Sequence, residues 1–515
     1  MQSFIARHED KIKGVLSGWD RIRFRGTLRF IANTHGLMNF LWLMRILLKD
    51  FKDTVLQWTD TIRATTLQLA EQARRPVIYL ASSAERKEER ARAIAAADRV
   101  EQGLICVLTC VEPCQTFTVG PNAQTKRLEL RPFTGKCLHQ YFYVQHPILG
   151  FMHVRLQTWL PFTVHVCLNG REWLARQMDR SGLGYVQQDN CFTDLAEGVR
   201  AQRLLTGQLR TDWERLLNGL VKRFHPGHAR LFAEQPLPYY WSADETEWAT
   251  DVLFRTPASL AELYPRLVRH GIQAFNCHDV LRFLGRRAHL SGPCRIQSDL
   301  KTRVEGMRLK HQVNRNALKM YDKQAVVLRI ETTINDPRDL KVYRAKENDP
   351  DGPKSWQRLR KGVADMHRRA QVSQAANARY LEALATVEDR QPLGEASKAL
   401  CQPTTWHGER RRALNPLNPE DARLLEAVNR GEFALQGFRN RDLRLLLFGT
   451  GADAATARRQ SAKVTRLIRL LRAHGLVQKI ATTHRYQIKE NARPTIVALL
   501  TARQADTKKL SDLAA

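Results

Sequence analysis

The stretch Ala454-Ala-Thr-Ala-Arg-Arg-Gln-Ser-Ala-Lys-Val-Thr-Arg-Leu-Ile-Arg-Leu-Leu-Arg-Ala-His474 carries the clearest structural pattern in the chain. Its apolar side chains recur at positions i, i+3, i+4 and i+7, which predicts a helix with one buried stripe. These apolar residues are Val464, Leu467, Ile468 and Leu471. Gly475 follows His474 and is expected to end the helix, because glycine readily adopts the left-handed conformation found after helix ends.

The other faces of this predicted helix are strongly basic. The residues expected there to contact phosphates and base edges are Arg458, Arg459, Lys463, Arg466 and Arg469. Ser461 and Thr465 lie between them and offer further hydrogen-bond donors. Such a row is the residue set by which proteins position themselves on nucleic acid.

Further elements are predicted on both sides of this helix. Two helices precede it, Glu420 to Val428 and Asn440 to Phe448, the second with Asn440 as its N-cap. After it, Leu476 to Ile480 and Arg485 to Lys489 alternate as two strands of a hairpin. His484 and Arg485 make the tip of this hairpin basic and are expected to contact nucleic acid.

The run Leu470-Leu-Arg-Ala-His-Gly-Leu476, followed by His484-Arg-Tyr486, resembles winged-helix regulators. The resemblance covers roughly a sixth of the chain, a part large enough for a small domain. It implies that residues 419–515 bind DNA. The alternative is that this region contacts another protein and that its arginines are only a solvated surface.

The charge of the whole chain also points to a polyanion. Lys and Arg number 82 against 52 Asp and Glu, which gives a formal net charge of +30 and a pI of about 10.2. This charge attracts nucleic acid and makes binding depend on salt. The apolar run Leu37 to Leu48 contains Arg45 and is too short to cross a bilayer, and Met1 to Asp10 is unlike a signal peptide. With nine cysteines, an odd number, a cytoplasmic, nucleoid-associated protein is expected, without a membrane partner.

The patterns predict an α+β fold of several domains, with a β-rich central body, helical insertions and a C-terminal winged helix. The predicted segments are a mainly helical N-terminal region 1–102, a β-rich segment 103–170, a helical segment 171–292, a sheet segment 293–345 that completes the body, a long charged helix within 346–387, a linker 388–418 and the winged helix 419–515.

Within the β-rich segment, His153 and His165 fall on the face opposite the aliphatic side chains. A polar sheet face that meets nucleic acid and a metal site are both open interpretations there. Aromatic residues interleave with Arg155 and Gln157, as in platforms that stack unpaired bases, although the core of a two-sided sheet looks similar. The closely spaced Cys106, Cys110 and Cys114 favour small buried side chains over a metal site.

Residues 307–333 hold the second informative pattern. Tyr321-Asp-Lys323 is followed by Leu328-Arg-Ile-Glu331, and this pair of strands resembles rolling-circle replication initiators of filamentous phages and small plasmids. The resemblance implies that Glu331 lies near a divalent metal and that a tyrosine attacks the DNA phosphodiester. The match reaches Tyr321, Asp322, Lys323, Leu328, Arg329 and Glu331 only.

This chain also departs from the initiator pattern. It has no His-hydrophobic-His metal motif, and no tyrosine between Arg295 and Met320. Lys310, Lys319 and Lys323 are expected to bind nucleic acid. The structural alternative is a cross-strand salt bridge between Lys323 and Glu331.

Other carboxylates are needed to complete a metal site for phosphoryl transfer. Glu331, Asp20 and Asp244 are the predicted catalytic residues and ligands for Mg²⁺ or Mn²⁺. Asp244, Glu247 and Asp251 are expected on one face of a helix, with Ser242 and Glu245 as a capping box at its start. The alternative is that the abundant arginines simply neutralise this helix face.

The expected function is a nucleic-acid-binding protein of a bacterial mobile element or plasmid, similar to replication initiators or transposases, with metal-dependent strand cleavage. The alternative is a non-catalytic DNA-binding regulator or a scaffold for structured RNA. Neither a Walker phosphate loop nor a Gly-x-Gly-x-x-Gly run is present, so chemistry driven by ATP or a dinucleotide has no support. The whole chain also resembles a set of bacterial proteins of similar length, which implies a bacterial origin and no particular activity.

Overall fold

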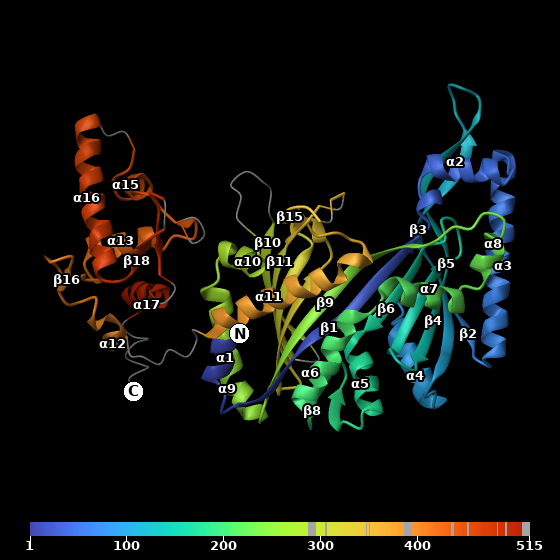
Figure 1. The fold of residues 1–515 in the computed structure, drawn as a ribbon, viewed down its shortest axis with the longest axis horizontal. Coiled ribbons are helices and arrows are strands. Elements are labelled where there is room, and N and C mark those ends of the chain that lie inside the picture. Colours follow the sequence, from blue (N-terminus) through green and yellow to red (C-terminus); the bar gives the residue numbers. More distant parts are fainter. Residues whose placement is uncertain are drawn as a thin grey trace. The chain divides into compact units, whose positions relative to one another are not determined.

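The structure, a computed structural model, describes residues 1–286, 295–303, 306–346, 348–349, 351–385, 393–433, 437–450, 453–480, 483–489 and 492–506 (Figure 1). The chain forms two compact units. The sheet unit comprises His8–Tyr264 and Arg295–Tyr380, and the C-terminal unit comprises Met1–Arg7, Pro265–Cys294 and Leu381–Ala515. The predicted α+β class is confirmed.

In the described part of the sheet unit, eleven strands pair in the order β10-β11-β12-β13-β9-β1-β6-β5-β4-β3-β2. Their bounds are β1 Ile12–Thr27, β2 Val77–Leu80, β3 Gly103–Pro121, β4 Leu128–His146, β5 Gly150–Gln157, β6 Val164–Asn169, β9 Tyr240–Phe254, β10 Ile296–Arg303, β11 Gly306–Val313, β12 Asn316–Lys323 and β13 Val327–Ile334. Two small ribbons accompany this sheet, β7 Tyr185–Gln188 with β8 Cys191–Leu195, and β14 Lys341–Arg344 with β15 Ser355–Arg358. Figure 1 shows β1 and β9 as long neighbouring strands.

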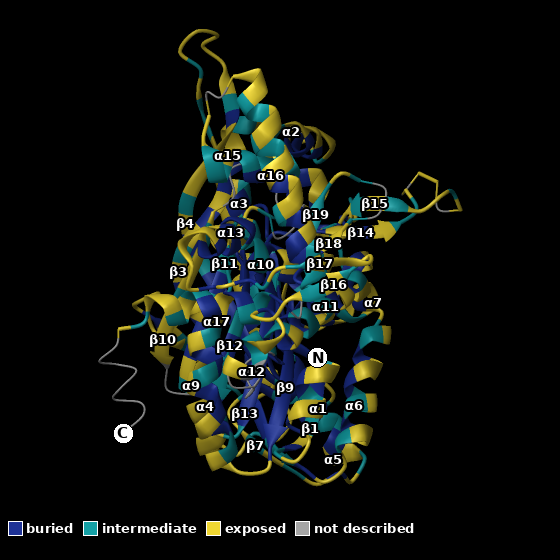
Figure 2. Ribbon diagram, turned by 90° about the vertical axis from the view of Figure 1, so that its left-hand side faces the viewer, coloured by how far each residue is buried: buried dark blue, intermediate teal, exposed yellow. Residues whose placement is uncertain are grey.

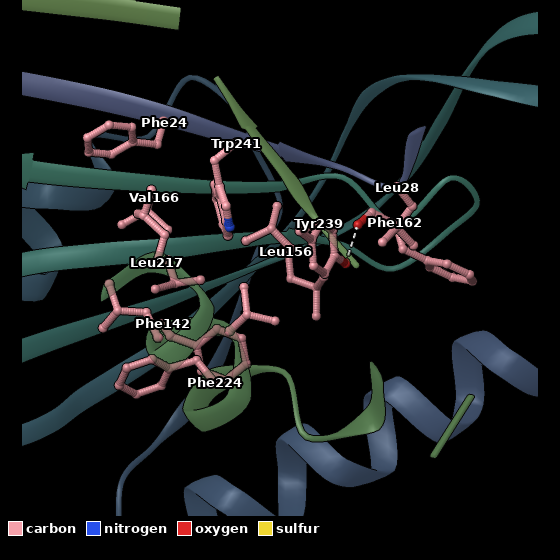
Figure 3. Packing of buried hydrophobic residues seen from close by; sticks show 14 of the residues in the cluster. Phe24, Leu28, Phe142, Leu156, Phe162, Val166, Leu217, Phe224, Tyr239 and Trp241 are labelled. Atoms are coloured by element: carbon pink, nitrogen blue, oxygen red, sulfur yellow. Dashed lines mark hydrogen bonds between the residues drawn. The ribbon is translucent and has the colours of Figure 1, made fainter. Parts of the chain in front are cut away.

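Helices α2 Thr34–Leu43, α3 Phe51–Gln72 and α7 Trp213–Phe224 cover one face of the sheet around β1, β4, β5 and β6. Figure 3 shows side chains from β1, β4, β5, β6 and α7 packed against one another. The rings of Phe142 and Phe224 lie 5.9 Å apart, and the hydroxyl of Tyr239 donates a hydrogen bond of 2.8 Å to the carbonyl of Phe162. Burying such aromatic side chains is the main source of stability for this half of the unit.

The opposite face is covered by α5 Gly170–Arg180 and α6 Gly198–Gly207, which pack on β1, β9 and β13 through Leu16, Leu253 and Val327. Helix α11 Met366–Leu384 covers the other side of β9 and β13, where Asn377 donates hydrogen bonds of 3.0 Å to the carbonyls of Trp248 and Ile330. These two strands are therefore buried on both faces (Figure 2). The other helices of the sheet unit are α4 Lys87–Ala97 and α8 Gly227–Leu231.

A β-bulge interrupts the pairing of β1 with β9. Between Trp19 and Ile22, β1 holds one residue more than the facing part of β9. Trp19 and Ile22 both pack in the same core, so the two residues between them, Asp20 and Arg21, lie on the other face together. The bulge thus places a carboxylate and a guanidinium side by side on the face that α5 and α6 partly cover.

In the C-terminal unit the predicted order of elements after residue 418 is confirmed. It runs α13 Pro419–Val428, α15 Asn440–Phe448, α16 Ala454–Ala473, β18 Val477–Lys479, β19 Tyr486–Ile488 and α17 Arg493–Gln504. A single bridge between Phe438 and Tyr486 adds a third short extended segment beside the hairpin. The other elements of this part of the chain are α1 Gln2–Arg7, α9 Pro257–Gln273, α10 Cys277–Phe283, α12 Leu393–Lys398, β16 Thr404–Trp406 and β17 Glu409–Arg411.

Some details of the C-terminal unit differ from the sequence-based expectations. Arg439, and not Asn440, is the N-cap of α15, and the carboxylate of Asp442 accepts a hydrogen bond of 2.7 Å from the Arg439 backbone. The described part of the expected linker 388–418 contributes Leu400 and Leu414 to the buried core of this unit. Burial of these two apolar side chains favours folding of the segment, although its Pro and Arg content is typical of a linker.

The helical prediction for the segment 171–292 is wrong at β9, which is a strand from Tyr240 to Phe254 and carries Asp244, Glu247 and Asp251. The capping box at Ser242 and Glu245 is wrong for the same reason. In the expected long helix within 346–387, residues Ser355–Arg358 are instead β15. The N-terminal region, expected to be mainly helical, begins with the 16-residue strand β1. Pairing with distant strands decides β1 and β9, and such pairing leaves no local signal, whereas β15 pairs with the nearby β14.

No helix among the described residues combines the length and the apolar character needed to cross a membrane.

A substitution at Gly170, the first residue of α5, tests how closely this helix packs on β1. A methyl group added at Gly170 comes within 2.1 Å of the Trp19 carbonyl oxygen, whereas one added at Gly198, the first residue of α6, meets nothing within 4 Å. We expect Gly170→Ala to lower the free energy of unfolding by about 1–3 kcal/mol, as overpacking does. The control Gly198→Ala should be neutral or slightly stabilising. Urea unfolding measures both, and equal stabilities of the two variants would contradict this packing.

Candidate functional site

Three buried carboxylates meet in the middle of the sheet. Asp20 comes from β1, Glu247 from β9 and Glu331 from β13, and these three strands are neighbours. One oxygen atom of each lies within 4.8 Å of the others. Asp20 and Glu331 are the two predicted site residues that the fold brings together.

Lys319 of β12 lies beside this carboxylate trio. Its ammonium donates hydrogen bonds of 2.9 Å to Glu247 and 2.6 Å to Glu331. Burial and the negative charge of Glu247 raise the pKa of Glu331 to about 7, although Lys319 acts in the opposite direction. Both carboxylates raise the pKa of Lys319 despite its burial, so its ammonium stays charged. The ammonium of Lys319 and the partial protonation of Glu331 near pH 7 therefore offset part of the negative charge of the trio.

Two fully buried arginines neutralise the acidic groups next to the trio. Arg329 donates to both oxygens of Asp251, at 2.6 and 2.9 Å, and to Asp20 at 3.2 Å. Arg171 of α5 lies 2.9 Å from the same Asp251. Burial opposes ionisation of Asp20, but Arg329 and Arg171 outweigh it and lower the pKa of Asp20. A buried charge is tolerated only when it is paired in this way.

The donor atoms of the trio fit a hard divalent cation, because Mg²⁺ and Mn²⁺ prefer carboxylate oxygens. Such a cation could be held by Asp20, Glu247 and Glu331, with the ammonium of Lys319 displaced from the last two. A bound ion would polarise a phosphoryl oxygen and lower the pKa of a bound water. The same geometry also serves as a buried ionic cluster without any ion.

Asp244, the third predicted metal ligand, lies elsewhere. A second irregularity, at Asp244 in β9, turns this side chain toward Arg25, whose Nε donates to it at 2.8 Å, and toward His165 at 3.7 Å. Burial lowers the pKa of His165, so this imidazole is neutral at pH 7. Glu247 therefore takes the place expected for Asp244. The sequence could have indicated Glu247, because in a strand Glu247 and Asp251 lie on one face, apart from Asp244.

The predicted nucleic-acid-binding lysines of the body lie in three different environments. Lys319 is engaged by the trio, Lys310 donates to Gln312 at 2.7 Å, and Lys323 is buried with its ammonium 5.2 Å from the centre of the Tyr321 ring. Glu331 faces Lys319 across the strands, so the expected pair of Lys323 with Glu331 is wrong.

Tyr321, which the resemblance to replication initiators singled out, faces Arg329 across the same pair of strands. Burial and the carboxylate of Glu331 raise the pKa of Tyr321, so its hydroxyl is protonated at pH 7. A nucleophilic role therefore requires a base that removes this proton.

In the C-terminal unit, α16 buries Val464, Ile468 and Leu471 as predicted and exposes its basic residues. The exposed residues are Arg458, Arg459, Lys463, Arg466 and Arg469. Lys463 lies 3.8 Å from Glu420. Within the described residues, no ion pair is formed by Arg458, Arg466 or Arg469.

The polar residues around the basic face of α16 have structural partners. Ser461 and Thr465, expected as donors to nucleic acid, are engaged by Asn440 of α15 through hydrogen bonds of 2.9 Å. At the hairpin tip, His484 is exposed, and Arg485 donates to the Gly437 carbonyl at 3.0 Å. The basic face of α16 is therefore formed by its exposed arginines and Lys463.

No protein-family model, curated protein or solved structure matches this chain. The function must therefore be argued from the residues and their geometry.

Replacing Arg329 tests how much its ion pairs with Asp251 and Asp20 stabilise the fold. Arg329→Met should lower the free energy of unfolding by about 3–5 kcal/mol, because buried Asp20 loses its ion pair and Asp251 keeps only its pair with Arg171. Arg338→Met is the matched control: Arg338 also binds an aspartate at 2.6 Å, but its side chain is 67% exposed. Little change is expected there. Chemical unfolding measures both variants, and equal effects would show that the cluster is not needed for stability.

Proposed function

We propose that the protein binds nucleic acid and that the exposed face of α16 contacts the duplex. The observation that carries this proposal is the set of three exposed arginines, Arg458, Arg466 and Arg469, which form no ion pair within the described residues. Unpaired guanidinium groups on one helix face are well suited to phosphates, which they bind through two parallel hydrogen bonds.

The surroundings of α16 support this proposal. Helices α13 and α15 precede it, and a hairpin with a third extended segment at Phe438 follows in contact with it, an arrangement similar to winged-helix DNA-binding domains. Asn440 fixes the middle of α16 to the start of α15. A rigid helix that projects its basic side chains from a packed domain is the usual means of entering the major groove. The net charge of +30 adds long-range attraction.

A second candidate function, metal-dependent cleavage of a phosphodiester bond, rests on the trio of Asp20, Glu247 and Glu331. Three carboxylates with oxygens so close together provide ligands for a divalent cation. The raised pKa of Glu331 also allows this group to exchange a proton near pH 7. Cleavage at the trio and binding at α16 are separable activities, so each can be tested without the other.

Removing the arginines of α16 tests the first proposal. The triple variant R458A/R466A/R469A should bind a fluorescent duplex more weakly than the wild type. The slope of log affinity against log salt concentration should fall by about 0.9 for each lost phosphate contact. Arg503→Ala is the control, because Arg503 pairs with Glu426 at 3.1 Å on another helix. Unchanged affinity and slope in the triple variant would refute the role of α16.

The second candidate is tested by strand breaks in the presence of Mn²⁺. Glu247→Gln and Glu331→Gln should each abolish cleavage while duplex binding stays at the wild-type level, because each removes a negative ligand and keeps the side-chain volume. Glu262→Gln is the control, since Glu262 is an exposed partner of Lys11 in the same unit. Wild-type protein that leaves both single and double strands intact would exclude this activity under the same conditions and would not affect the binding proposal.

A further inference from the structure

A pocket of about 530 Å³ opens on the face of the sheet that α3 and α7 do not cover. It lies over β1, β4, β5, β6 and the first part of β9, all within the sheet unit. Its size falls in the range of sites that hold a small ligand. Five arginines and three carboxylates are among the described residues that line it, so the pocket is positive overall.

The most regular feature of this pocket is a row of three arginines on β1. Arg21, Arg23 and Arg25 alternate with the buried Ile22 and Phe24 and therefore point to the same side. Residues two apart in a strand repeat about every 6.6–6.8 Å, which is comparable to the distance between successive phosphates of an extended nucleic-acid strand. We call these three residues the arginine row.

The members of the arginine row remain accessible. The side chains of Arg23 and Arg25 are 47% and 49% exposed, although Arg23 lies 3.4 Å from Glu245 and Arg25 lies 2.8 Å from Asp244. Arg21 forms no ion pair with a described residue within 4 Å. Arg21 is exposed as well. Partial desolvation opposes its charge, but the nearby carboxylates of Glu247 and Asp20 raise its pKa, so it keeps this charge. An incoming phosphate therefore meets three charged guanidinium groups.

The floor of the pocket combines Arg155, which is ion-paired with Glu112 at 2.8 Å, with neutral polar side chains. His139, His153 and Gln157 line it, and burial lowers the pKa of His139 to about 4 and that of His153 to about 3. Neutral imidazoles both donate and accept hydrogen bonds. His153 makes no hydrogen bond to a described residue, and its ring centre lies 5.0 Å from that of Tyr143. Groups of this kind suit the edge of a nucleic-acid base or a sugar hydroxyl.

The pocket ends beside the carboxylate trio, whose own side chains are buried and do not line it. The bulge in β1 puts Arg21, at the end of the arginine row, on the same face as Asp20. Glu247 is the strongest of the charges that raise the pKa of Arg21, which places the guanidinium next to the trio. A strand that follows the row along β1 therefore runs toward Asp20, Glu247 and Glu331.

We propose that this pocket holds a segment of single-stranded nucleic acid, with successive phosphates on Arg21, Arg23 and Arg25 and one base above His139 and His153. The inference rests on the proposed nucleic-acid binding and adds a second contact surface to it, distinct from α16. The ligand is recognised by its phosphates and by an unpaired base. A duplex cannot supply the unpaired base, because its bases already pair with each other.

The test compares two variants on two probes. A fluorescent oligo-dT of about 12 nucleotides serves as the single strand, and a duplex of mixed sequence serves as the second probe. R21Q/R23Q/R25Q should weaken binding of the single strand about tenfold or more, as expected for lost charge-assisted contacts, and leave duplex binding unchanged. The α16 variant R458A/R466A/R469A should show the reverse pattern. Arg63→Gln, an exposed arginine of α3, is the control.

The outcomes separate this inference from the proposed function. Wild-type protein that binds duplex but not oligo-dT overturns the pocket assignment alone, and wild-type protein that binds neither overturns both. Parallel loss of both probes in each variant overturns the existence of two separate surfaces. A free mononucleotide, dTMP, added as competitor distinguishes the sources of phosphate: affinity equal to that of oligo-dT overturns the strand assignment.

A crosslinking measurement needs no variant, so its result does not depend on whether a variant folds. Oligonucleotides that carry 5-iododeoxyuridine are irradiated on the wild-type protein, and the attached peptides are identified by mass spectrometry. Crosslinks at Tyr141 or in peptides of β5 and β6 support the inference, since these line the pocket. Crosslinks confined to the C-terminal unit overturn it.

Discussion

The pairing of β1 with β9 is the contact on which the sheet unit depends. β1 lies between β6 and β9, so this single ladder joins the strands on the β2 side of the sheet to those on the β10 side. Both strands are long, and two of the hydrophobic clusters of the unit pack against them. The carboxylate trio and the pocket also exist only because these strands are neighbours. Without this ladder, two sheet edges would be open and Asp20 would have no acidic neighbour from β9.

The buried charges of the sheet are a second constraint on the fold, because each of them must lie beside a group of opposite charge. Arg329 is fully buried, and the carboxylates of Asp20, Asp251, Glu247 and Glu331 are each ion-paired with Arg329 or Lys319. Apolar side chains of similar volume often give equal stability at such positions, while a single broken pair is costly. Packing alone therefore does not require this cluster. Its position next to a pocket lined with arginines is consistent with a site that handles a charged ligand.

The sequence was informative where structure is local. The 3.6-residue repeat of α16 predicted its buried stripe and its basic face, and residues 103–170, predicted to be rich in strands, hold β3 to β6. β9 was mistaken for a helix, because its acidic residues fit helical spacing and its partners are far away in the chain. This error also selected Asp244 in place of Glu247. The likeness to winged-helix regulators and to replication initiators stays a prediction, as does the origin in a mobile element.

The arginine row has a consequence for the synthesis of the protein. β9 begins at Tyr240, roughly 210 residues after β1 ends at Thr27, so β1 leaves the ribosome long before its partner exists. At typical rates of translation this delay is on the order of 10 to 40 s. A long strand with an unpaired edge is prone to aggregate during such a wait, and charges on alternate residues oppose that association. Arg21, Arg23 and Arg25 thus protect the nascent chain before they can serve any ligand.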